Sequence, residues 1–154
     1  MFILGIAIFL ISTFLTVILL AGNWAYFINL PTMLMVLIPL AAIMTATKSF
    51  KVFYYGLKAV ALPKKPITEE LRGQAASLFR LLSKSTAIIS ALGFLISLIN
   101  MLLGMDYSYP DIQDAIARNI GAALVIFVYG LFLIAAIFEP AVFNLKKRRD
   151  TERK

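Results

Sequence analysis

The residues with the clearest potential for chemistry form one periodic set of small, weakly polar side chains. Between Ser83 and Gly104, eight of 22 residues are Ser, Thr, Gly or Asn. Seven of them follow an alternating spacing of three and four residues, which places them on one face of a helix. We call these seven residues the polar stripe: Ser83, Thr86, Ser90, Gly93, Ser97, Asn100 and Gly104.

Two interpretations of the polar stripe stay open at this point. Small residues let helices approach closely and hydroxyls bond across the contact, so the stripe is compatible with ordinary helix packing. Alternatively, its oxygens replace the hydration of an ion, or the stripe faces a separate protein chain. The rest of the segment is almost wholly Ile, Leu, Phe, Ala and Met, so only this face has a polar role.

The end of the last apolar segment carries a second candidate group, with Tyr129, Gly130, Glu139 and Pro140 as gate or interface residues. Glu139 is the only acidic residue inside an expected membrane span. A carboxylate in lipid is costly and normally paired, which favours an interface residue that snorkels or pairs with Lys or Arg over a gate. Its place near the inner end rules it out as a midplane ion site.

A third group, Glu69, Glu70 and Arg72, precedes the third apolar segment. Such a charge run is usually a solvated helix face. The functional alternative is contact with a cytoplasmic effector of complementary charge. Elsewhere, Thr45 and Thr47 are expected to hydrogen-bond back to their own helix.

Several reaction classes are excluded by composition. The chain has no Cys and no His, so it cannot build a thiol nucleophile, a Ser/His arrangement or a His- or Cys-ligated metal site. No Gly-rich phosphate-binding loop is present. We therefore expect a protein that is not an enzyme and that uses neither a cofactor nor a metal.

Hydropathy predicts an all-α membrane protein. Apolar residues make up 61% of the 154 residues, which is more than one soluble core can bury. Four segments are long enough to cross a hydrocarbon layer of about 30 Å. The expected spans are residues 2–21, 31–47, 86–103 and 120–143, in a single membrane domain covering 1–154.

Charge distribution predicts the orientation. Eight of the 15 Lys and Arg residues lie between Lys48 and Lys84, and six lie between Lys146 and Lys154. The positive-inside rule therefore places residues 48–84, the tail 144–154 and both termini in the cytoplasm, with the chain in the inner membrane of a cell. The net charge of +7 is attributed to this topology and to anionic lipid, not to nucleic acid.

The cytoplasmic segment is expected to extend the second and third spans as a short antiparallel hairpin. Phe50, Phe53 and Leu57 recur at helical spacing, so the second helix is predicted to continue past the bilayer until Pro63. Thr68, followed by Glu69 and Glu70, is typical of a new helix start.

Three segments together resemble the MotA/TolQ/ExbB family, most closely flagellar-stator MotA with a shortened cytoplasmic region. Residues 29–37 (NLPTMLMVL) are similar to its D-x-P-S-apolar start of the second span, and residues 92–102 (LGFLISLINML) to its third span. Tyr129-Gly130, with Pro140 and then residues 144–146 (NLK), resembles the end of its fourth span.

The resemblance implies a ring of five such subunits around a pair of single-span MotB-, TolR- or ExbD-like partners, whose membrane carboxylate carries the coupling proton or sodium ion. The polar stripe then faces the central partner helices. The chain departs from the family where Phe94, Ile126 and Phe127 stand in place of hydroxyl residues.

We therefore expect a ring-forming subunit of an ion-driven membrane motor. Two alternatives stay open. One is a non-conducting scaffold or assembly subunit of the same fold, and the other is an unrelated small-solute transporter.

Overall fold

The computed structural model describes residues 2–21, 28–62, 68–104 and 112–152, and every regular element in these ranges is a helix. The helices are α1 (Phe2–Ala21), α2 (Leu30–Ala46), α3 (Phe50–Ala61), α4 (Glu69–Leu103), α5 (Ile112–Phe132), the π-helix η2 (Leu133–Phe138) and α6 (Glu139–Glu152). The all-α prediction is therefore confirmed for the described residues. Pro63, where the second helix is predicted to end, lies outside them.

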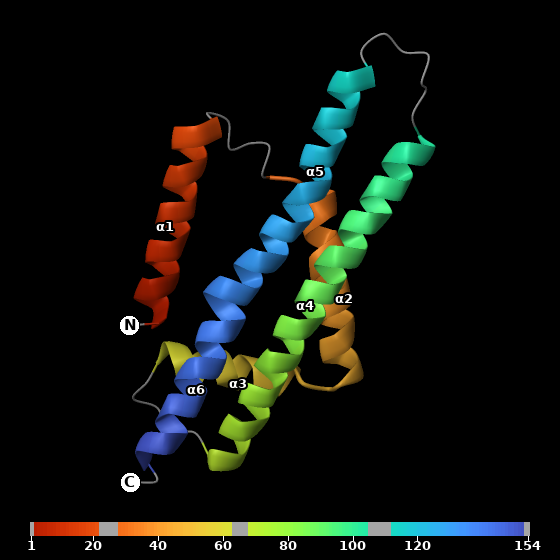
Figure 1. Cartoon of the computed structure of the whole chain (residues 1–154). Helices are drawn as coiled ribbons and strands as arrows, with labels where there is room; N and C mark the ends of the chain where they lie inside the picture. Colours follow the sequence, from red (N-terminus) through yellow and green to blue (C-terminus); the bar gives the residue numbers. More distant parts are fainter. Residues whose placement is uncertain (1, 22–27, 63–67, 105–111, 153–154) are drawn as a thin grey trace.

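Helices α2, α3, α5, η2 and α6 all pack on α4, whereas α1 packs on η2 and α3 (Figure 1). Its 35 residues correspond to about 52 Å at 1.5 Å per residue, well beyond the thickness of a hydrocarbon layer. The predicted start is confirmed, because the Thr68 hydroxyl accepts a hydrogen bond from the Leu71 N–H (3.4 Å). Helices α5, η2 and α6 form one continuous rod that runs antiparallel to α4.

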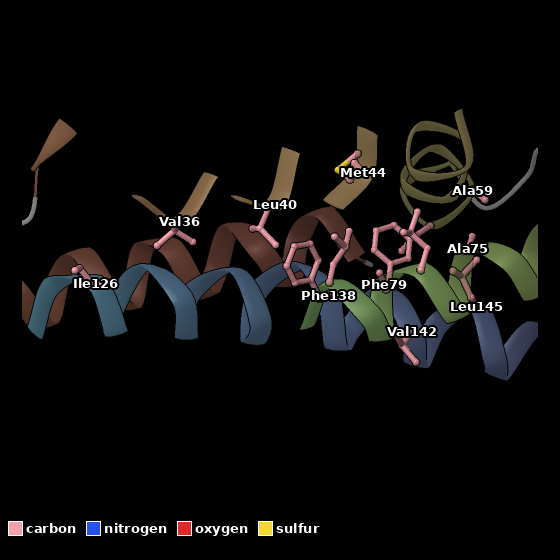
Figure 2. Close-up of a cluster of buried hydrophobic side chains, with 14 residues drawn as sticks. Val36, Leu40, Met44, Ala59, Ala75, Phe79, Ile126, Phe138, Val142 and Leu145 are labelled. Carbon is pink, nitrogen blue, oxygen red and sulfur yellow. The ribbon is translucent and has the colours of Figure 1, made fainter. Parts of the chain in front are cut away.

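The hydrophobic core lies where α2, α3 and the rod meet α4 (Figure 2). Val36 and Leu40 from α2 contribute to it, as does Phe79, whose ring centroid lies 5.5 Å from that of Phe53 in α3 and 6.4 Å from that of Phe138 in η2. Phe79 is fully buried. The core is therefore concentrated at the N-terminal half of α4, while much of α1 and of the C-terminal half of α4 exposes large apolar side chains.

The predicted straight continuation of the second helix is wrong. Helix α2 ends at Ala46, and α3 leaves at an angle of 110° to it. The turn is a Schellman-type helix end, in which the Ser49 N–H donates to the Met44 carbonyl (3.0 Å) and the Lys48 N–H to the Thr45 carbonyl (3.0 Å). Lys48 takes the left-handed conformation that glycine usually occupies there, with φ 51°. The expected hairpin is thus replaced by a helix lying across the base of α4.

Two helices of the described chain, Glu69–Leu103 and Asn119–Lys147, are long and apolar enough to cross a membrane. The bent pair α2 and α3 makes a third if it counts as one span, and α1 contains a shorter apolar helix, Phe2–Thr16. The apolar helices indicate a membrane-embedded protein. The number of four spans stays a prediction.

The contact between α3 and α4 depends on a glycine. A Cβ added at Gly56 would lie 2.9 Å from the Ala75 Cβ and 2.9 Å from a ring carbon of Phe79. We predict that Gly56→Ala destabilises the protein by about 1–3 kcal/mol, because α3 must move away from α4. Thermal unfolding in a fixed detergent, followed by helical circular dichroism, measures this.

Gly73 in α4 supplies the matched control, since a Cβ there meets nothing within 4 Å. Gly73→Ala should stabilise the protein by up to about 1 kcal/mol through helix propensity. Equal shifts from the two variants would contradict the packing role of Gly56.

Candidate functional site

The polar stripe lies on one face of α4, as predicted, but its two halves have different surroundings. Ser83, Thr86, Ser90 and Gly93 are buried. Ser97 is half-buried, whereas Asn100 and Gly104 are exposed. We call the first four residues the inner half and the last three the outer half of the polar stripe. In the outer half, the described helices cover Ser97 in part and leave Asn100 and Gly104 exposed.

The inner half packs directly on α5. A Cβ at Gly130 would overlap the Ser90 Oγ, and one at Gly93 would lie 3.2 Å from the Ile126 Cγ2. Each contact joins a small residue on one helix to a side chain on the other, which is how helices approach closely in membranes. The inner half therefore serves helix packing within one chain, the first of the two interpretations drawn from its spacing.

The hydroxyls of the inner half are directed to partners of the same chain in two of three cases. Ser83 Oγ donates to Glu139 Oε1 (2.7 Å), and Thr86 Oγ1 donates to the Leu82 carbonyl one turn earlier (2.7 Å). Ser90 Oγ is buried and has no hydrogen-bond partner in the structure. A buried hydroxyl without a hydrogen bond reduces the free energy of unfolding by about 1–3 kcal/mol. The packing of Ser90 on Gly130 must offset this cost.

The contact of Glu139 with Ser83 was not predicted from sequence. The expectation for Glu139 was an interface carboxylate that snorkels or pairs with Lys or Arg, and its side chain is exposed while it accepts the serine hydrogen bond. The two residues are 56 positions apart, so no local spacing signals the contact. Both candidate groups, the polar stripe and the end of the fourth span, thus meet at one point.

The π-helix η2 immediately precedes Glu139 and Pro140. Within it the chain uses wider turns, and the Glu139 N–H donates to the Ile134 carbonyl five residues back. Proline has no N–H and its ring crowds the carbonyl four residues earlier, here that of Ala136. A locally widened helix accommodates this crowding without a break, and such segments are frequent at functional sites.

Tyr129 connects the start of α2 to the contact between α4 and α5. Its Oη accepts a hydrogen bond from the backbone N–H of Asn29 (3.1 Å), and Asn29 Oδ1 in turn accepts from the Thr32 N–H (3.3 Å) to cap α2. Tyr129 and Gly130 therefore join three helices, with α2 on one side and α4 on the other. The residue pair acts as an intramolecular junction.

An aromatic pair separates the two halves of the stripe. Phe94 of α4 and Phe127 of α5 have ring centroids 5.0 Å apart. They stand between Ser90 and Ser97 along the contact of α4 with α5. Neither side chain offers an oxygen to an ion at this level.

The acidic start of α4 does not form one surface with Arg72. Glu69 and Glu70 are exposed, and Glu70 Oε1 accepts from Gln74 Nε2 (3.2 Å). Arg72 is only 4% exposed. The predicted back-bonding of Thr45 and Thr47 is confirmed, with hydrogen bonds of 2.8 Å to the carbonyls of Ala41 and Ile43.

A separate apolar cleft of about 380 Å³ lies between α1, α2, α5 and η2. Its lining is almost entirely apolar, with Phe14, Met33 and Phe132 among the larger side chains. The hydroxyl of Thr13, which also lines the cleft, is bonded to the Phe9 carbonyl (2.9 Å). Such a cleft suits lipid chains and offers no polar recognition for a small solute.

Comparison of the chain with protein-family models, with curated proteins and with solved structures finds no match. The resemblance to the MotA/TolQ/ExbB family therefore depends on the residues of the three segments alone.

The Ser90–Gly130 contact generates a direct prediction. Gly130→Ala should destabilise the protein by about 1–3 kcal/mol or more, because the new methyl overlaps Ser90. In the double variant Ser90→Gly/Gly130→Ala the overlap is relieved, so it should be more stable than Gly130→Ala alone. Thermal unfolding of the four proteins of this cycle measures the coupling.

Gly121→Ala in α5 is the control, since a Cβ at Gly121 meets nothing within 4 Å. Strictly additive effects at Ser90 and Gly130 would show that the two residues are not in contact.

Proposed function

We propose that the chain is a ring-forming subunit of an ion-driven membrane complex. Five copies surround a pair of single-span partner helices whose carboxylate takes up and releases a proton or a sodium ion. The subunit lies in the inner membrane with both termini in the cytoplasm, and it catalyses no reaction of its own.

The exposed amide of Asn100, in the outer half of the stripe, is the observation that carries this proposal. Asn100 is exposed among Ile96, Ile99 and Leu103, which are also exposed. A side-chain amide that faces lipid leaves its polar groups unsatisfied, and polar residues in spans usually face the interior of a bundle. A second protein helix beside Ser97 and Asn100 would provide the missing partners.

Contacts between the segments that resemble the family also support the proposal. Asn29 of the first segment bonds Tyr129 of the third, and Ser90, just before the second, packs on Gly130. Segments up to 100 residues apart thus meet in one junction. This is the arrangement expected if they serve a common fold.

The non-conducting scaffold of the same fold is the second candidate. Ser83 and Thr86 donate hydrogen bonds from their hydroxyls to oxygens of the same chain. Ser90 packs on Gly130, and the ring of Phe94 lies beside that of Phe127. A continuous row of oxygens along the stripe is thereby interrupted. An uncompensated charge at the bilayer centre costs at least about 2.5–3.5 kcal/mol, so conduction requires the partner's carboxylate to bridge the interruption.

Oligomeric state is the first test of the proposal. Native mass measurement of the complex extracted in mild detergent should give five copies of this chain with two copies of a single-span partner. A monomer that carries no partner would overturn both the motor and the scaffold.

Partner binding is the second test. Ser97→Leu should abolish co-purification of the partner, because a bulky side chain blocks close approach of a helix to the outer half. Ser85→Leu, at a half-buried position of α4 outside the stripe, is the matched control and should leave recovery unchanged. Equal recovery with both variants would show that the outer half faces something else.

Ion flux separates the motor from the scaffold. Proton and sodium flux is measured in liposomes that contain the intact complex. A second complex, in which the partner's acidic residue is changed to its amide, defines zero flux. Ser97→Ala should slow the flux while the assembly stays intact, because it keeps the small size and removes only the hydroxyl. Wild-type flux equal to that zero for both ions would leave the scaffold as the function.

A further inference from the structure

A basic pocket opens at the inner end of α4, where this helix meets α6. Its volume is about 490 Å³. Helix α4 contributes Arg72, Arg80 and Lys84 to the lining, and α6 contributes Lys146. No Asp or Glu is among the lining residues. The exposed Arg80, Lys84 and Lys146 bring three like charges to one cavity, and a bound anion would offset their repulsion.

The cations are held in a row by helix geometry. Arg80 and Lys84 are one turn apart and share one face of α4, and Arg72 lies about two turns before Arg80. Arg72 is buried, while Arg80 and Lys84 are exposed. The pocket therefore gathers the exposed charges of α4 beside Lys146 of α6.

Apolar side chains also line the pocket. Leu145 is buried, Ala76 is half-buried, and Leu81 exposes 42% of its surface. Cations and apolar side chains in one cavity match an amphiphile, whose phosphate meets the cations while its hydrocarbon meets the leucines. A free phosphate ion has no group that would use the apolar part.

The depth of the pocket is that of the inner lipid headgroups. Lys84 is followed by residues 85–103 without a charge, 19 residues that correspond to about 28 Å, close to the hydrocarbon thickness. Helix α3 crosses α4 at the level of the pocket, since Gly56 packs on Ala75. It exposes Tyr54 and Tyr55 there, and tyrosine favours the headgroup level.

An apolar path leads from the pocket into the bilayer. Leu81, Ile88, Leu92 and Leu95 are all exposed and follow at intervals of seven, four and three residues, which is one face of α4. A lipid whose headgroup occupies the pocket would lay an acyl chain along this row.

We propose that the pocket is a binding site for the phosphate headgroup of an anionic phospholipid of the inner leaflet. Arg80, Lys84 and Lys146 contact the phosphate, and Leu81 contacts the start of the acyl chain. Basic pockets beside membrane helices on the cytoplasmic side are suited to such headgroups. The site is independent of whether ions pass along the polar stripe.

The test compares anionic and zwitterionic lipid on the full-length protein in its native assembly. The probes are a short-chain phosphatidylglycerol, the matching phosphatidylcholine and inorganic phosphate, and the readout is bound probe per chain by native mass measurement. The wild type should bind phosphatidylglycerol in preference to both other probes. Arg80→Gln/Lys84→Gln should weaken this binding about 30-fold, or about fivefold for each cation removed.

Lys51→Gln/Lys58→Gln in α3 removes the same charge outside the pocket and is the matched control. It should change the affinity by less than about twofold if the site is specific. Equal losses of phosphatidylglycerol affinity in the two double variants would show that general surface charge causes the effect. That result would overturn the proposal.

Leu81→Gln distinguishes a lipid from a soluble phosphate. It should weaken phosphatidylglycerol binding and leave the weak binding of inorganic phosphate unchanged, because only the lipid has hydrocarbon to contact the Leu81 side chain. Inorganic phosphate that binds as tightly as the lipid, or displaces it at equal concentration, would also overturn the proposal.

Discussion

The structure depends on the close approach of α4 and α5, which Gly130 and Gly93 permit. In a membrane, lipid tails are as apolar as leucine, so helices gain little from burying apolar surface against each other. Association then relies on dense packing, which needs small residues where backbones come near. The contact of Ser90 with Gly130 is tight enough to leave a buried hydroxyl without a partner. Where the polar stripe is covered and where it is open both follow from this contact.

The rod opposite α4 adjusts to the same constraint at its inner end. Pro140 follows η2 directly, and the wider turns of η2 accommodate the crowding that the proline ring causes. Phe138 and Leu145 remain on the buried side and pack into the core with Phe79. The carboxylate of Glu139 is placed beside Ser83, which donates to it. The π-helix thus keeps the rod against α4 over both the outer and the inner part of the contact.

Helix α4 consequently presents different chemistry at different depths. Its inner end carries cations beside α6, its middle packs on α5, and Ser97 and Asn100 lie at its outer end. A helix of 35 residues is long enough to reach beyond the hydrocarbon layer, so the charged end lies outside it. The two surfaces proposed above, one for a partner helix and one for a lipid headgroup, therefore lie at opposite ends of α4.

Local sequence determined the helices, the face on which the polar stripe lies, the Thr68 cap and the back-bonded Thr45 and Thr47, because each depends on residues within one or two turns. Which residues of the polar stripe are buried by the chain's own helices was decided only by tertiary structure. The partners of Ser83 and Ser90 lie 56 and 40 residues away, and helical periodicity is the same for an intramolecular and an intermolecular contact. The turn after α2 also escaped prediction, because Lys48 stands in the left-handed position where glycine is the usual signal. Helical spacing specifies a face, but long-range packing specifies what covers it.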